Sequence, residues 1–404
     1  MTIGATPARM DALPAEGDFS IVVGGPLFQV FRRARLAGDG LQLVRRRIMV
    51  IATLAWVPLL VLSAADGKAW GDAVAVPFLR DIDAHARFLI ALPLLIVAEI
   101  VVHRRMRPIV GQFLTLGLVR DGARKHFDRA IEGAMRLRNS VLAEVILIAI
   151  VYIVGILIVW RYYVALGAAT WYAAPAGDGR RHLYLAGWWY FLVSLPMFQF
   201  LLLRWYFRLF IWARFLWQVS RIDVTYAPMH PDRLGGLGFL SRLGYAFAPL
   251  LIAQGTLLAG MLANRIFYEG ARLTDFRLEI FVFVAIMVAV VIAPLFVFVE
   301  PLSRARRTGL REYSHIAKRH LDEFEAKWLH GGADAGELLV GNPDVSSLTD
   351  MSSSFDVVRE MRLVPITRDL VLQLVVMTLL PLAPLLLTMI SVEELLGQFV
   401  RIVF

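Results

Sequence analysis

The feature that most constrains this chain is a series of long, uninterrupted apolar runs. A helix needs about 20 apolar residues to cross the roughly 30 Å hydrocarbon core of a membrane. Seven runs of about this length occur, at residues 48–65, 86–102, 141–160, 187–203, 246–266, 278–299 and 370–392. Of the 404 residues, 58% are hydrophobic and only 19% are charged, which leaves too little polar surface for a soluble protein. The sequence therefore predicts an all-α, polytopic membrane helical bundle with seven transmembrane helices.

The distribution of arginine and lysine predicts the orientation of these helices. The segments 1–47, 103–140 and 300–369 hold seven, nine and ten basic residues, whereas the loops on the opposite side hold at most three each. Basic loops stay in the cytoplasm, so the N-terminus is expected inside and the C-terminus outside. The same loops facing anionic lipid account for the net charge of +9 without a nucleic-acid partner. The preference for arginine over lysine favours a bacterial protein, and hence the inner (plasma) membrane.

Four regions follow from this layout. Residues 1–47 form a cytoplasmic segment with an interfacial amphipathic helix in PLFQVFRRARL. Residues 48–303 contain the first six spans, a charged cytoplasmic helix at 120–138 and a joint at 228–240. Residues 304–367 form cytoplasmic anchor helices, with a Gly- and Asp-rich loop at 331–350 and a short helix at 353–362. Residues 368–404 form the seventh span and a short outside tail.

The joint, PMHPDRLGGLGFL, is polar and glycine-rich between two apolar spans. HPD matches the tripeptide of the J-domain co-chaperones, and GGLG could cradle a phosphate. A J-domain needs a soluble helical hairpin around the tripeptide, and a phosphate loop needs a preceding strand and a nearby lysine. A mechanical joint explains the residues better, because proline stops the preceding chain, aspartate caps the next segment and glycines allow close approach. The residues concerned are His230, Pro231, Asp232, Gly235, Gly236 and Gly238.

Charged residues near the ends of spans are costly in hydrocarbon and therefore informative. Five of them are expected at similar depth near the inner surface: Glu99, Glu144, Glu300, Arg204 and Arg208. They either extend to the interface or form an inner layer of ion pairs between helices.

The fifth and seventh spans carry patterned faces. Gly255, Ala259 and Ala263 recur at every fourth position, which is typical of close helix packing in membranes. On the seventh span, polar residues and prolines fall roughly on one face and are candidates for lining a pore: Gln373, Met377, Pro381, Pro384, Thr388 and Ser391. Glu393 and Glu394 come next, and a ring of such acids would favour cations. Alternatively, Thr388 and Ser391 bond back to the helix and the acids solvate its end.

No chemistry beyond this is indicated. The chain has no cysteine, and its eight histidines show no ligand spacing, so neither a metal nor another cofactor is expected. No nucleophile can be paired with a base, so the chain is not expected to be an enzyme.

Two strings resemble a family of uncharacterised bacterial multi-pass inner-membrane proteins. They are HPDRLGGLGFL (230–240) and SSSFDVVREMRLVPITRDLVLQL (352–374), which fit the patterns HPDRxGGLGFL and SFDVVRxMRxVP. This resemblance carries no assigned activity. The layout alone looks like the seven-helix channels of the insect olfactory and gustatory receptors. It implies a cytoplasmic anchor and a tetrameric pore lined by the seventh span.

The sequence thus favours a homo-oligomeric ion channel, with a tetramer as the favoured assembly and membrane lipid as its surroundings. A small ligand or an ion is a further possible partner. Two alternatives stay open. One is a transporter for a small solute near Glu99, Glu144, Arg204 and Arg208. The other is a non-conducting scaffold whose basic helices bind a partner or anionic lipid.

Overall fold

Among the residues that the structure describes, the fold is all-helical apart from one short pair of strands. The computed structural model describes residues 19–36, 43–154, 170–175, 181–334, 336–339 and 341–389. Within these ranges six helical stretches are long and apolar enough to cross a membrane: Val44–Ala65, Ile82–Thr115, Leu185–Ser220, Gly238–Glu269, Leu273–Trp328 and Arg368–Met389. They support the predicted multi-pass helical membrane protein. The other predicted span, 141–160, is described only in part, as the shorter apolar helix α6 (Val141–Val154).

Wider turns interrupt two of the membrane stretches. After α2 (Val44–Ala65), the second stretch combines α3 (Ile82–His85), the π-helical turn η3 (Ala86–Ala91) and α4 (Leu92–Thr115). The fourth predicted span combines α8 (Leu185–Trp189), the π-helical turn η5 (Tyr190–Ser194) and α9 (Leu195–Ser220). Pro93 and Pro196 each lie two residues after the end of such a turn. Proline lacks an N–H and crowds the carbonyl four residues earlier, so the preceding turn widens.

Narrower 3₁₀ turns occur in the second half of the chain. The turn η6 (Gly238–Arg242) leads into α10 (Leu243–Glu269). Next, η7 (Leu273–Phe276), α11 (Arg277–Ile292), η8 (Ala293–Phe298) and α12 (Val299–Trp328) follow without a break. The last described elements are α14 (Arg368–Leu379) and η9 (Leu380–Met389). Two of these narrower turns contain proline, since Pro294 lies in η8, and Pro381 and Pro384 lie in η9.

The smaller elements lie outside these stretches. They are α1 (Pro26–Arg33), η2 (Phe78–Arg80), α5 (Asp121–Arg138), α13 (Pro343–Arg359) and the antiparallel strands β1 (Ala173–Pro175) and β2 (Arg181–Leu183). Helices α1 and α5 coincide with the predicted amphipathic and charged helices. Helix α13 begins earlier than predicted, within the stretch expected to be a loop. The reason is a cap: Asn342 accepts a hydrogen bond from the Asp344 N–H at 2.9 Å, and Pro343 occupies the first helical position.

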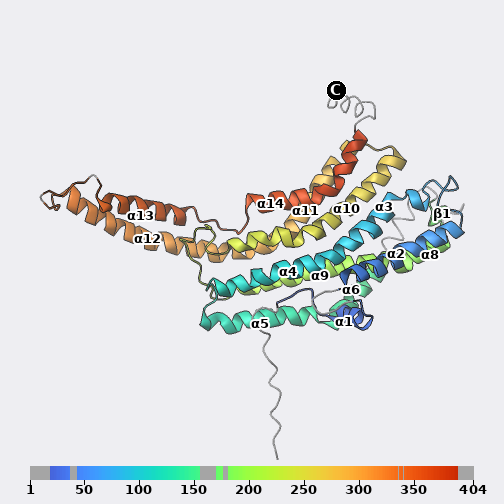
Figure 1. The fold of residues 1–404 in the computed structure, drawn as a ribbon, viewed down its shortest axis with the longest axis horizontal. Helices are drawn as coiled ribbons and strands as arrows, with labels where there is room; N and C mark the ends of the chain where they lie inside the picture. The colour runs from blue at the N-terminus through green and yellow to red at the C-terminus, as the bar shows by residue number, and fades with distance from the viewer. Residues whose placement is uncertain are drawn as a thin grey trace, which may run out of the picture.

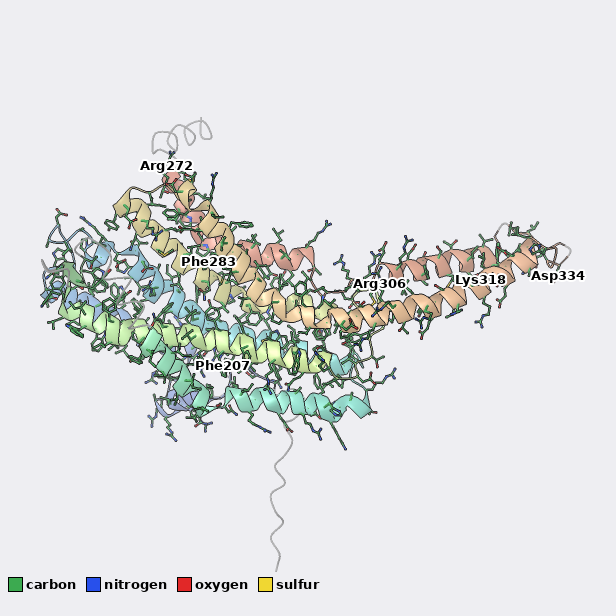
Figure 2. All side chains as sticks on the ribbon, turned by 180° about the vertical axis from the view of Figure 1, so that it is seen from behind. Phe207, Arg272, Phe283, Arg306, Lys318 and Asp334 are labelled. Atoms are coloured by element: carbon green, nitrogen blue, oxygen red, sulfur yellow. The ribbon has the colours of Figure 1, made fainter. Side chains whose placement is uncertain are left out.

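The long helices lie side by side, and one hairpin extends beyond them (Figure 1). Helix α4 packs between α9 and α10, while α2, α5 and α6 pack around the α4–α9 pair. On the other side of α10, α14 packs against α10 and α11. Helices α12 and α13 pair into a hairpin that projects away from the bundle, from near Arg306 past Lys318 to Asp334 (Figure 2).

Candidate functional site

Charged side chains lie buried where four helices meet. Glu99 on α4 is central: its carboxylate lies 2.5 Å from Arg47 on α2, and 2.7 Å from Arg208 and 3.7 Å from Arg204 on α9. These four side chains are at most 7% exposed. An unpaired buried charge costs several kcal/mol, on the order of 3–5 kcal/mol when one partner is removed, so the pairs hold the three helices in register.

A second carboxylate extends the cluster to α6 and to the N-terminal segment. Arg204 Nε lies 3.3 Å from Glu144 Oε1, and Glu144 Oε2 accepts a hydrogen bond from the Leu27 N–H at 2.8 Å. Arg208 also lies over the Trp205 ring, 4.7 Å from its centroid. We call Arg47, Glu99, Glu144, Arg204 and Arg208 the charge network. Three guanidinium groups face two carboxylates there, so its formal charge is positive.

Sequence reasoning named four of these five residues, and the structure brings all four together. It missed Arg47, which belongs to a basic run expected to face the cytoplasm. A periodic pattern could have revealed it, because Arg47, Ile51, Ala55 and Leu59 recur at every fourth position and form the buried face of α2.

Glu300 is a correction to the predicted layer. Its side chain is 61% exposed at the start of α12, 2.7 Å from Arg304 and 3.9 Å from Arg307. Because α12 leaves the bundle there, Glu300 pairs with arginines one and two turns further along its own helix instead of reaching the charge network.

The segment before α1, residues 19–25, is buried against α4, α5 and α9. The Ser20 carbonyl accepts a hydrogen bond from Arg138 at 2.5 Å, and the Ser20 hydroxyl lies 2.9 Å from Nδ1 of His103. The Phe19 ring packs 4.9 Å from that of Phe215. Burial, and secondarily the neighbouring Arg208, lowers the pKa of Arg138 to about 10. The irregular segment therefore closes the bundle beside the charge network, which the sequence did not indicate.

The predicted joint is organised by one carboxylate. Asp232 accepts hydrogen bonds from the backbone N–H groups of Leu234 at 2.8 Å, Gly236 at 3.2 Å and Gly238 at 2.8 Å. His230 Nδ1 lies 2.9 Å from the same carboxylate. Gly235 and Gly236 adopt φ values of 64° and 94°, in the left-handed region that favours glycine. The turn after Pro231 thus has its free donors satisfied by one side chain.

The joint also receives the end of α13. The Arg362 N–H donates to the Arg233 carbonyl at 2.7 Å, and the Arg233 and Glu360 side chains form an ion pair. A Cβ at Gly235 would lie 2.9 Å from the terminal methyl group of Met361, so the two segments are in close contact, and the φ of 64° favours glycine there. The strings HPDRLGGLGFL (230–240) and SSSFDVVREMRLVPITRDLVLQL (352–374), far apart in sequence, are therefore in direct contact.

The predicted pore residues of the seventh span fall into three groups. Gln373 and Pro381 pack on α10, where a Cβ at Gly244 would lie 2.9 Å from Gln373 and one at Gly255 would lie 3.1 Å from Pro381. Met377 is partly buried in the same core. Pro384 and Thr388 are exposed. The last group, Ser391, Glu393 and Glu394, lies outside the described residues.

Of the predicted pore residues that the structure describes, only Pro384 and Thr388 are exposed on α14 and η9. Leucine and valine make up most of the exposed surface instead, at Leu372, Val376, Leu379, Leu380, Leu386 and Leu387. The small residues of α10 explain the difference, because they admit the backbone of α14 so closely that a Cβ at Gly255 would overlap the Thr378 carbonyl. Ala259 and Ala263 continue this face and pack in an apolar cluster with Leu382 and Leu385.

Among the described residues, no three histidine, aspartate or glutamate side chains lie close enough to hold a metal ion. The chain matches no protein-family model, no curated protein and no solved structure. The resemblance of the two strings to a bacterial family stays a prediction.

Proposed function

We propose that this protein is a homo-oligomeric ion channel of the bacterial inner membrane, with α14 and η9 lining the conduit. The observation that supports it is the position of α14 and η9. They pack on α10 and α11 on one side and carry six exposed leucine and valine side chains on the other. A pore on a symmetry axis needs one such edge helix from each subunit.

The chemistry of the free face refines the expected pore. Leu372, Val376, Leu379 and Leu380 recur at three- and four-residue spacing, so they would form apolar rings around an axis. A narrow apolar ring expels water and blocks ions until it widens. The constriction would then be a hydrophobic gate, while Glu393 and Glu394 at the outer mouth would favour cations.

The α12–α13 hairpin, expected in the cytoplasm, would act on this gate. The chain passes from the end of α13, docked on the joint through Arg362, to α14 within a few residues. Thr367 caps α14 by accepting a hydrogen bond from the Leu370 N–H at 3.1 Å. A displacement of α13 would therefore reach α14 directly. The charge network would hold α2, α4, α6 and α9 fixed meanwhile.

A polar substitution on the free face tests the channel. In planar bilayers, purified wild-type protein is expected to give discrete current steps. Val376→Ser should raise the open probability several-fold, because a hydroxyl ring keeps the constriction wet. Val61→Ser on α2 is the matched control, since Val61 is a similarly exposed valine on the other side of the bundle.

Native mass spectrometry of the same sample counts the subunits. A monomer would contradict the proposal, as would saturable solute uptake without current. Equal effects of Val376→Ser and Val61→Ser would exclude α14 as the gate.

A further inference from the structure

A pocket of about 740 Å³ opens between the first turns of α5 and the end of α9. The two helices lie side by side along the edge of the bundle (Figure 1). Its charged and aromatic lining consists of Arg120, His126, Arg129, Trp217, Arg221 and Asp223.

The pocket has cations without acidic partners. Three arginines face one aspartate, and within the part of the chain that the structure describes none of the three forms an ion pair. Arg124, on the same helix but outside the pocket, is paired with Asp128 at 3.3 Å. Unpaired guanidinium groups around one concavity attract an anion, and their forked geometry matches phosphate oxygens.

The backbone of α5 adds to the positive electrostatic potential of the arginines. Helix α5 has 18 residues, begins at Asp121, and receives no side-chain cap at Arg120. The Ala123 N–H donates to the Arg120 carbonyl at 2.9 Å, which leaves the N–H groups of Asp121 and Gly122 at the positive end of the helix dipole, beside the arginines and the Asp121 carboxylate. Phosphate groups bind at such helix ends. Trp217 is half exposed: Arg221 lies over one side of its ring, 5.4 Å from the centroid, and the exposed remainder offers an apolar surface for the rest of a ligand.

The position along α9 distinguishes a soluble ligand from a lipid. Arg221 follows Arg208 of the charge network by thirteen residues, which corresponds to about 20 Å along the helix. The helical stretch Leu185–Ser220 has 36 residues, well above the roughly 20 needed to cross the hydrocarbon. In the proposed layout, which sets the charge network near the inner membrane surface, the pocket would lie beyond the reach of lipid headgroups.

We propose that this pocket binds a soluble organic phosphate, whose phosphate group meets Arg120, Arg129 and Arg221 and whose apolar part packs on Trp217. The proposal does not depend on the channel function. The site adjoins the joint: Val119 and Val224 form a backbone bridge, and the Thr225 N–H donates to the Leu118 carbonyl at 2.8 Å. A ligand that contacts both α5 and α9 would therefore stabilise the contact between the segments 118–119 and 224–225, next to the joint.

Titration calorimetry of the full-length protein in phosphatidylcholine nanodiscs tests the site, with ADP and inorganic pyrophosphate as probes. Wild type is expected to bind ADP, and the double variant Arg129→Ala/Arg221→Ala should bind it at least tenfold more weakly. Arg136→Ala is the matched control and should change the affinity less than twofold. Arg136 is an exposed arginine on the same helix, about 10 Å beyond Arg129 and outside the pocket.

Several results would overturn the proposal. They are an absence of ADP and pyrophosphate binding by wild type, an unchanged affinity in the double variant, or an equal loss in Arg136→Ala. If the double variant does not fold, as judged by its thermal transition, Arg120→Glu replaces it with the same expected loss.

A second arm separates the two sources of phosphate. In nanodiscs that contain 30% phosphatidylglycerol, the ADP affinity should stay within about twofold at 0.15 M salt, where charges are screened beyond about 8 Å. A tenfold weaker affinity there, absent from the double variant, would identify the pocket as a lipid headgroup site and contradict the soluble ligand.

Discussion

The charge network and the α12–α13 hairpin use the same residue types in opposite ways. In the network, Glu99 joins arginines from two other helices, and every side chain is nearly buried. Along α12, the pairs Glu300–Arg304 and Lys318–Asp322 each join residues one turn apart on one helix, and their side chains are more than half exposed. Buried pairs between helices fix tertiary structure, whereas exposed local pairs mainly keep a helix soluble.

The base of the α12–α13 hairpin differs from both regions, because contacts other than ion pairs join its helices. Arg306 donates to the Arg359 carbonyl at 2.6 Å, and Gly309 is so close to α13 that a Cβ there would lie 3.1 Å from Val358. Backbone and apolar contacts therefore join α12 to α13 near the joint. The tip, around Lys318 and Asp334, projects away from the bundle (Figure 2).

The largest expected effect comes from removing the central carboxylate. Glu99→Gln leaves three buried arginines with one acidic partner, and we expect a loss of about 3–5 kcal/mol in the free energy of unfolding. The corresponding drop in transition temperature is measured by heating the protein in detergent and monitoring the folded fraction by size-exclusion chromatography. Glu300→Gln is the matched control on α12 and should leave the transition temperature unchanged.

A double variant shows whether the loss of stability comes from buried arginines left without an acidic partner. Adding Arg47→Met to Glu99→Gln removes one unpaired guanidinium, so it should recover part of the lost stability. Equal transition temperatures for Glu99→Gln and Glu300→Gln would abolish the distinction between the two regions.

An intermediate effect is expected at the joint. Asp232→Ala leaves three backbone N–H groups without their acceptor, and we expect a cost of about 2–3 kcal/mol. Chemical unfolding in mixed micelles gives the value. Asp356→Ala, at an exposed position on α13, is the control and should be neutral within about 0.5 kcal/mol. A neutral Asp232→Ala would mean that the glycines alone hold the turn.

Much of the fold could be predicted because local rules govern it. Apolar length predicted the membrane helices, and the glycines and aspartate of HPDRLGGLGFL predicted a turn with a capped backbone. Proline positions alone would not have predicted the changes of winding, because the turn widens before Pro93 and tightens at Pro294, whereas Pro58 and Pro249 lie inside regular α-helices. That outcome depends on how each helix packs on its neighbours.

The site was harder to predict because it depends on which face meets which neighbour. The periodicity of the seventh span grouped Gln373 with Pro381 as pore-lining candidates, but it could not say that both would pack on α10 beside Gly244 and Gly255. Arg47 was predicted to face the cytoplasm because its neighbours Arg45 and Arg46 are basic. The recurrence of Arg47, Ile51 and Ala55 at every fourth position, which indicates a buried face, was overlooked. Residues 19–25 have no periodicity, so only tertiary contacts reveal their burial.

The smallest effect on stability is expected at the tip of the hairpin. A change of pH should affect the ion pairs there but not the charge network. Lys327 Nζ lies 2.6 Å from Glu337 and 2.8 Å from Asp344. Its hydrogen bonds hold the pKa of both carboxyl groups below their ordinary values. Carboxyl groups with a lowered folded pKa stabilise the folded state at neutral pH. They lose this contribution as the pH falls below about 4, through the folded pKa.

A spin label at Leu338→Cys reports this change, because the chain has no other cysteine and Leu338 is exposed. Its mobility should rise between pH 5 and about pH 3, whereas Lys327→Met should make it mobile throughout. The transition temperature of the helical bundle should stay unchanged over the same pH range, because three arginines surround the Glu99 carboxylate. A label that stays immobile at pH 3 would show that the backbone holds the tip without these pairs.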